Sequence, residues 1–117
     1  FNVKSQKFNL KKFDELELNI NPCFIKIDVE GYDHKVIKGM LKTIKKYKPF
    51  ILVELNKENF FQINKLLKKD YHPYLFIFEN KKFKKINTKI INEIDKKFKR
   101  NFNFSMPRNV YFIPKKS

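Results

Sequence analysis

The chain has 117 residues, the length of one domain or of part of a larger one. Its formal net charge is +15, but only Arg100 and Arg108 are arginines, and the lysines are spread along the whole chain. Proteins that recognise nucleic acids usually concentrate arginine for bidentate contacts, so we expect no specific nucleic-acid partner, only salt-sensitive affinity for anionic surfaces.

The cysteine count and the length of the apolar runs indicate the cellular compartment that we expect for the protein. The single cysteine, Cys23, cannot form an internal disulfide, which favours a reducing, cytoplasmic compartment. Its position just before an apolar run predicts that it is buried in the core. No apolar run approaches the roughly 20 residues that a membrane-spanning helix needs. Because the chain begins with Phe1 rather than Met, we expect a fragment or a processed product.

Taken in chain order, residues 1–22 are polar and irregular, with one short helix expected after Asn9 as its N-cap. A strand over 23–29 follows. From 33 to 47, apolar residues recur at helical spacing and lysines fill the other face, which predicts one amphipathic helix. Gly39 inside this helix costs about 1 kcal/mol relative to alanine. Close packing onto a neighbouring strand would account for it.

The second half alternates between strand and helix patterns. The strand over 50–55 is apolar on both faces, as in a parallel sheet that helices cover on both sides. Asn56 can cap the next helix, over 57–69, which has Phe60, Ile63 and Leu67 on one face. The remaining elements are a strand over 74–79, a hairpin partner in FKKIN, a weak helix over 88–98 and a last strand over 109–114. This order predicts an α/β layered fold.

Carboxylates stand at the carboxyl ends of two predicted strands. Alternate residues of a strand share a face, so Lys26, Asp28 and Glu30 point the same way, and Glu54 lies near the end of the next strand. Ligands bind at this edge of open α/β sheets, so these positions predict a site. Gly31 directly after the first strand favours a positive φ or a close backbone approach, as turns that line a ligand often need.

A purely structural explanation fits the same residues. Strand ends carry charge because they emerge into water, and Lys26 could simply neutralise Asp28. Other candidates are weaker, since His34 and His72 are far apart in sequence, and neither a Ser–His–Asp arrangement nor a zinc-ligand spacing is present. The two glycines cannot form a glycine-rich nucleotide turn or a phosphate-binding loop.

The stretch FIKIDVEGYDHKVIKGM, followed by KPFILVEL, resembles the second half of the FkbM family of S-adenosylmethionine-dependent methyltransferases. The family pattern is a strand reading K-I-D-x-E-G, a helix reading roughly V-L-K-G, and a Pro-led strand that ends in Glu. The matching residues are Lys26, Ile27, Asp28, Glu30 and Gly31, then Val36, Ile37, Lys38 and Gly39, and finally Pro49 and Glu54. Phe13 and Asp14 resemble a Leu-Asp segment that precedes this block, and NVYFIP resembles the closing strand. The resemblance spans most of the chain, but only residues 24–55 are specific.

The resemblance implies the C-terminal half of a Rossmann-like methyltransferase sheet, with parallel strands, helices and a final antiparallel strand. Residues 1–117 would then be a single partial domain. The family's cofactor half, with its D-x-G-A-N-x-G turn, has no counterpart in this sequence, so the cofactor-binding residues are unknown. The implied cofactor is S-adenosylmethionine, and the implied acceptor is a hydroxyl of a sugar, glycan or other small metabolite. A divalent metal could lower the pKa of that hydroxyl, but no ligand set supports one.

Within this resemblance, Asp28 is the first candidate for the general base that takes the hydroxyl proton, and Glu30 is the second. Glu54 and Gly31 would line the acceptor site, and Lys26 would be a charge partner. Two other interpretations stay open. One is a non-catalytic, truncated Rossmann-like module that binds a partner chain, or forms a homo-oligomer, through an uncovered sheet edge. The other is a basic nucleic-acid-binding domain.

Overall fold

The computed structural model of the chain describes residues 3–102 and 108–116. The elements, in chain order, are the 3-10 turn η1 (Phe13–Glu15), β1 (Phe24–Ile27), α1 (Asp33–Lys38), α2 (Leu41–Tyr47), β2 (Phe50–Leu55), α3 (Lys57–Leu67), β3 (Tyr71–Ile77), β4 (Lys82–Lys85), α4 (Thr88–Phe102) and β5 (Arg108–Pro114). None of the helices in these ranges has both the length and the apolar character needed to cross a membrane.

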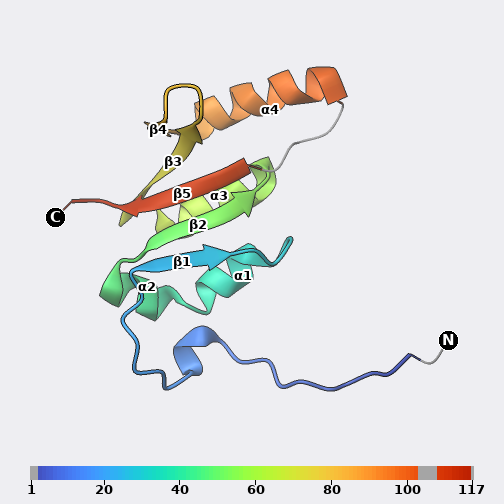
Figure 1. Cartoon of the computed structure of the whole chain (residues 1–117), viewed down its shortest axis with the longest axis vertical. Helices are drawn as coiled ribbons and strands as arrows, with labels where there is room; N and C mark the ends of the chain where they lie inside the picture. The colour runs from blue at the N-terminus through green and yellow to red at the C-terminus, as the bar shows by residue number, and fades with distance from the viewer. Residues whose placement is uncertain (1–2, 103–107, 117) are drawn as a thin grey trace.

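The five strands form one mixed sheet in the order β1-β2-β5-β3-β4. β1 and β2 are parallel, and every other neighbouring pair is antiparallel. The last strand, β5, lies between β2 and β3 and runs against both, so β1, β2 and β3 end at the same edge (Figure 1). The expected final antiparallel strand is confirmed. The expectation of parallel pairing holds only for β1 and β2, because β5 separates β2 from β3.

One face of the sheet carries the core. Alternate residues of the strands are buried there, namely Ile27, Ile51, Val53, Leu55, Tyr71, Leu75, Val110 and Phe112. The helices that cover this face form one layer, since α1 contacts α3 and α3 contacts α4, and Figure 1 shows α3 behind β2 and β5. Asn56 caps α3 through a 2.9 Å hydrogen bond from the backbone N–H of Asn59, as expected.

The opposite face of the sheet is open. The strand registers bring aromatic side chains together on it, namely Phe24, Phe50, Tyr74, Phe76, Phe83 and Tyr111. Phe24 and Phe50 are paired across β1 and β2, and they are 52% and 49% exposed. Phe83 packs edge-to-face on Phe76 and on Tyr111, with ring centroids 5.2 and 5.1 Å apart. The predicted covering of both faces by helices is therefore wrong for the described residues.

The single helix expected over 33–47 is interrupted between α1 and α2. The carbonyl of Gly39 accepts a hydrogen bond from the backbone N–H of Asp14, at 2.8 Å. The N–H of Thr43, which would continue the helix to that carbonyl, donates instead to the Asp14 carboxylate. An added Cβ at Gly39 would lie 3.2 Å from the Cβ of Lys12. The close packing expected at Gly39 exists, but its partner is the segment before η1 rather than a strand.

Four smaller expectations are corrected. Asn9 caps no helix, because only the short η1 forms and Lys12 occupies its N-cap position. Cys23 is exposed rather than buried. β1 ends at Ile27, two residues early, because the chain enters a turn there. β3 begins at Tyr71 rather than at 74, because its antiparallel pairing with β5 extends back to that residue.

Candidate functional site

The predicted acids lie at or just after the carboxyl ends of two strands that are side by side. β1 pairs in parallel register with β2 up to Ile27 and Val53, and the next residues along the chain are Asp28, just after β1, and Glu54, within β2. Asp28, Glu30 and Glu54 are all exposed. The structure thus brings the ends of the two acid-bearing segments to one edge of the sheet, where their side chains are open to solvent.

A tight turn separates Asp28 from α1. The backbone N–H of Tyr32 donates to the carbonyl of Val29 at 3.1 Å, and the two residues between them both have positive φ, 25° for Glu30 and 89° for Gly31. Both central residues of the mirror-image β-turn I′ have this sign of φ. Glycine adopts it freely, whereas a glutamate does so only under constraint. Of the two reasons considered for Gly31, the positive φ is confirmed.

The other reason, a close backbone approach, finds no partner within the described residues. A Cβ added at Gly31 would meet no atom within 4 Å. Gly31 is also exposed, so the space beside its backbone is open to solvent. Its predicted contact with a substrate stays a prediction.

Asp33 is the residue that sequence reasoning missed. It is the first residue of α1, and it is only 1% exposed although its side chain is a carboxylate. Its carboxylate accepts hydrogen bonds from the backbone N–H groups of Val29 and Gly31, at 3.4 and 3.3 Å. An acid in the first turn of a helix is common because it favours the helix dipole, so its presence alone does not indicate a second role. Its spacing of two residues after a turn glycine was the available signal for a second role.

Lys26 and the histidines do not gather with the acids in one cluster. Lys26 is exposed and pairs with Leu52 on the open face. His34 lies in α1, after the carboxyl end of β1, and its Nδ1 has no hydrogen-bond partner among the residues that the structure describes. His72 lies near the start of β3, at the other edge of the sheet, opposite Ile113. The two histidines therefore belong to opposite ends of the strands.

The described residues also provide few side chains that could hold a metal ion or a nucleoside cofactor. In the ranges that the structure describes, no three His, Cys, Asp or Glu side chains lie close enough together to hold a metal ion. Gly39 cannot cradle a phosphate or a ribose because its Cβ position lies against Lys12, and no described residue closes the space beside Gly31 to form a cradle there. These residues do not fit a cofactor pocket.

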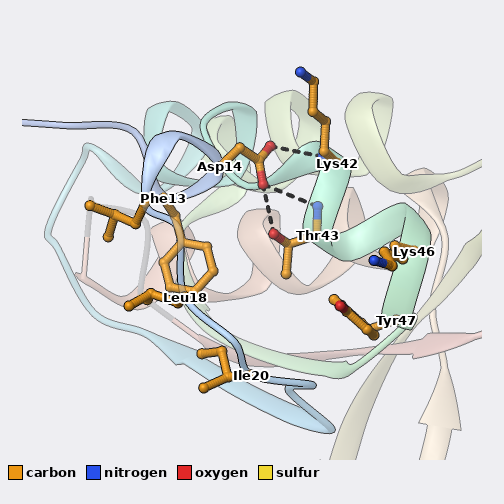
Figure 2. A pocket seen from close by; sticks show the side chains of 9 residues that line it. Phe13, Asp14, Leu18, Ile20, Lys42, Thr43, Lys46 and Tyr47 are labelled. Carbon is orange, nitrogen blue, oxygen red and sulfur yellow. Dashed lines mark hydrogen bonds between the residues drawn. The ribbon is translucent and has the colours of Figure 1, made fainter.

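A cavity of about 170 Å³ lies between η1 and α2 (Figure 2). Its walls include Ile20, which precedes β1, and Tyr47, which ends α2 shortly before β2. The cavity therefore lies toward the amino ends of these strands. None of the four predicted site residues lines it.

Asp14 at the edge of this cavity has a structural role. As Figure 2 shows, its Oδ2 accepts from the backbone N–H of Lys42 at 2.8 Å, and its Oδ1 accepts from the N–H and the hydroxyl of Thr43 at 3.1 and 2.7 Å. Met40, the N-cap residue of α2, supplies no side-chain cap. Asp14 therefore caps α2 from 28 residues upstream.

We expect replacement of Asp14 by alanine to lower the free energy of unfolding by about 1 kcal/mol at neutral pH, as loss of a helix cap does. Burial raises the pKa of the Asp14 carboxyl, but hydrogen bonds from Thr43 and Lys42 and the Lys42 charge outweigh it, so the pKa lies below 3.8. The ionised form then stabilises the fold above the unfolded-state pKa, and this stabilisation is lost as the pH falls through the lower folded-state pKa.

Urea unfolding at neutral pH and in acid measures this effect. The difference between wild type and Asp14→Ala should shrink as the pH falls below about 4. Glu15→Ala, which removes the exposed neighbouring acid, is the matched control and should have little effect. A difference for Asp14→Ala that stays constant across this range would contradict the prediction.

Comparison with known proteins adds one match. A family model described as the methyltransferase FkbM domain matches residues 1–104. The matched stretch includes β1, β2 and all four predicted site residues. No curated protein and no solved structure matches the chain.

Proposed function

This chain belongs to the FkbM methyltransferase family, and from that membership we propose that it contributes the acceptor side of an S-adenosylmethionine-dependent O-methyltransferase. The proposed acceptor is a hydroxyl of a sugar or another small metabolite. The observation that carries the proposal is the edge where β1 and β2 end together, with Asp28, Glu30 and Glu54 exposed beside an open turn. Ligands bind at this edge of α/β sheets.

Methyl transfer to a hydroxyl requires a group that removes the hydroxyl proton. A carboxylate within hydrogen-bond reach can act as this general base. Asp28 is our first choice because it directly follows β1, whose backbone is held by pairing with β2. Glu30 is second because it stands on the turn, and Glu54 and Gly31 would contact the acceptor.

S-adenosylmethionine is the methyl donor that the family implies. The described residues offer no glycine-lined cradle for it, so we assign no cofactor contact to them. The proposal therefore limits these residues to binding the acceptor, orienting its hydroxyl and accepting its proton. Orientation alone supplies a large part of the acceleration of a displacement reaction.

The absence of cofactor contacts on these residues is tested by calorimetric titration with S-adenosylhomocysteine. The sample is first checked for folding by circular dichroism. We expect no saturable binding in the micromolar range. Saturable binding would contradict the acceptor-side assignment and would put cofactor contacts on this chain.

The reaction itself is tested with methyl-labelled S-adenosylmethionine and a panel of sugars and other polyols, using the protein that carries this chain. We expect the label in a methyl ether. Label found on nitrogen or carbon would overturn O-methylation.

The open face of the sheet favours one second candidate, a non-catalytic module that binds a partner chain. Phe24 and Phe50 leave about half of their surface exposed, and β1 is an edge strand of the described sheet. Both features are typical of surfaces that pair with another polypeptide. Absence of label transfer in the reaction test described above, together with a mass above the 14.3 kDa of one chain in light scattering, would favour this candidate.

A further inference from the structure

Asp33 lies beneath the turn that follows β1. Its side chain is 1% exposed, whereas Glu30, Gly31 and Tyr32 in the turn are exposed. Each carboxylate oxygen has its own donor, since Oδ1 accepts from the N–H of Val29 at 3.4 Å and Oδ2 from the N–H of Gly31 at 3.3 Å. A buried carboxylate is costly without such donors, so the side chain and the turn conformation depend on each other.

The turn needs this support because its backbone is unusual. Glu30 has a φ of 25° and Gly31 a φ of 89°. A non-glycine residue keeps such a backbone only where the surrounding structure over-determines it. The Tyr32 N–H bond to the Val29 carbonyl closes the turn, and the Asp33 carboxylate holds it from below.

Asp33 is itself fixed by the core. It begins α1, whose Ile37 is fully buried, and α1 contacts α3 in the helix layer. The hydrogen bonds of its carboxylate run back to the turn rather than along α1. The side chain thus links the buried helix layer to the exposed segment that carries Asp28 and Glu30.

We propose that Asp33 is a positioning residue. Its carboxylate holds Glu30 and Gly31 in the left-handed conformation and thereby sets where Asp28 and Glu30 stand at the edge of the sheet. The consequence for turnover rests on the proposed function, whereas the consequence for the turn does not. Asp33 does not touch the acceptor, because it is buried under the turn.

Asp33→Asn tests the proposal at the level of the turn. The amide has nearly the same shape but replaces one acceptor oxygen with an NH₂ group, which cannot accept from a backbone N–H. We expect amide hydrogen exchange to quicken by about tenfold or more at Val29 or Gly31, whichever N–H faces the amide nitrogen, with altered NMR shifts at Val29, Glu30 and Gly31. Unchanged exchange and shifts would overturn the proposal, whatever the protein's function.

Gly31→Ala reaches the same turn by a different route and keeps the test decisive if Asp33→Asn does not fold. A methyl group at Gly31 meets no described atom within 4 Å, so its effect on the turn comes from the strained φ and not from a clash. We expect it to alter the same NMR shifts. If both variants fold, their effects on turnover should not add, because each disrupts the same turn. Fully additive effects, or an unchanged turn in Gly31→Ala, would overturn the proposal.

The effect of Asp33 on turnover is tested by measuring methyl transfer from labelled S-adenosylmethionine to the acceptor panel. We expect Asp33→Asn to lower kcat by about 10- to 100-fold with little change in KM, as loss of positioning does. Asp14→Asn is the matched control, because it also removes a carboxylate bonded to two backbone N–H groups, but at α2. It should destabilise the fold and leave kcat unchanged.

The outcomes separate the two proposals. If Asp28→Asn lowers turnover but Asp33→Asn does not, the positioning role is wrong and the proposed function stands. If neither lowers turnover, the proposed function is wrong and the exchange data alone decide whether Asp33 holds the turn. An equal loss of kcat in Asp14→Asn would show that the effect is general destabilisation, which would overturn the positioning role.

Discussion

Replacing Phe112 with alanine should lower the free energy of unfolding by about 3–5 kcal/mol, the usual cost of removing a buried phenylalanine ring. Phe112 is 0% exposed in β5, the strand that joins β2 to β3, and its ring stacks on Phe60 with centroids 6.4 Å apart. A domain of this length has a total stability of roughly 6–18 kcal/mol, so the loss is a large share. Urea unfolding followed by circular dichroism measures it.

Phe83→Ala is the matched control, because it removes the same ring from the open face. Phe83 is 51% exposed and packs on the rings of Phe76 and Tyr111, so the expected loss is about 1–2 kcal/mol. Equal losses in the two variants would contradict the one-sided core. They would indicate that the open face is covered in solution, as the partner-binding candidate requires.

Replacing Asp28 with asparagine should lower the rate of methyl transfer by about 10²–10⁴-fold, the usual contribution of a general base. The substitution keeps the size of the side chain and removes its ability to accept a proton. Because Asp28 is exposed, the fold should be unchanged by circular dichroism. The measurement is label transfer from S-adenosylmethionine to the best acceptor of the panel.

Glu54→Gln is the comparison for this variant. Glu54 stands at the same edge, on β2, and is proposed only to contact the acceptor, so its replacement should act mainly on KM. Glu30→Gln should cost less than Asp28→Asn if the ranking of the two acids is right. Full turnover in Asp28→Asn would remove it as the base, and a large loss in Glu30→Gln alone would transfer that role to Glu30.

The local features of the chain could be predicted from sequence. The cap at Asn56 and the buried face of Phe60, Ile63 and Leu67 are confirmed, because a cap and a helical period involve residues only three or four apart. The parallel pairing of β1 with β2 follows from the short helical crossover between them. The predicted ends of strands and helices were less accurate, as at β1 and β3.

The interruption at Gly39 shows where local reasoning stops. The apolar spacing over 33–47 is continuous, so the sequence predicts one helix. The helix breaks because the backbone and carboxylate of Asp14 take the hydrogen bonds that would carry it past Gly39. That competition exists only once η1 has packed against the helix, and no pattern within the helix indicates it.

The sequence by itself determined the identity of the acids, their place at two strand ends and the need for glycine at position 31. Only the tertiary structure decided that β5 enters between β2 and β3, that the helices leave one aromatic face open, and that Asp33 lies under the turn. The physical reason is how far apart in the sequence the interacting residues are. Side-chain alternation and turn chemistry are set by neighbours along the chain, whereas strand order and burial depend on contacts between residues far apart in sequence.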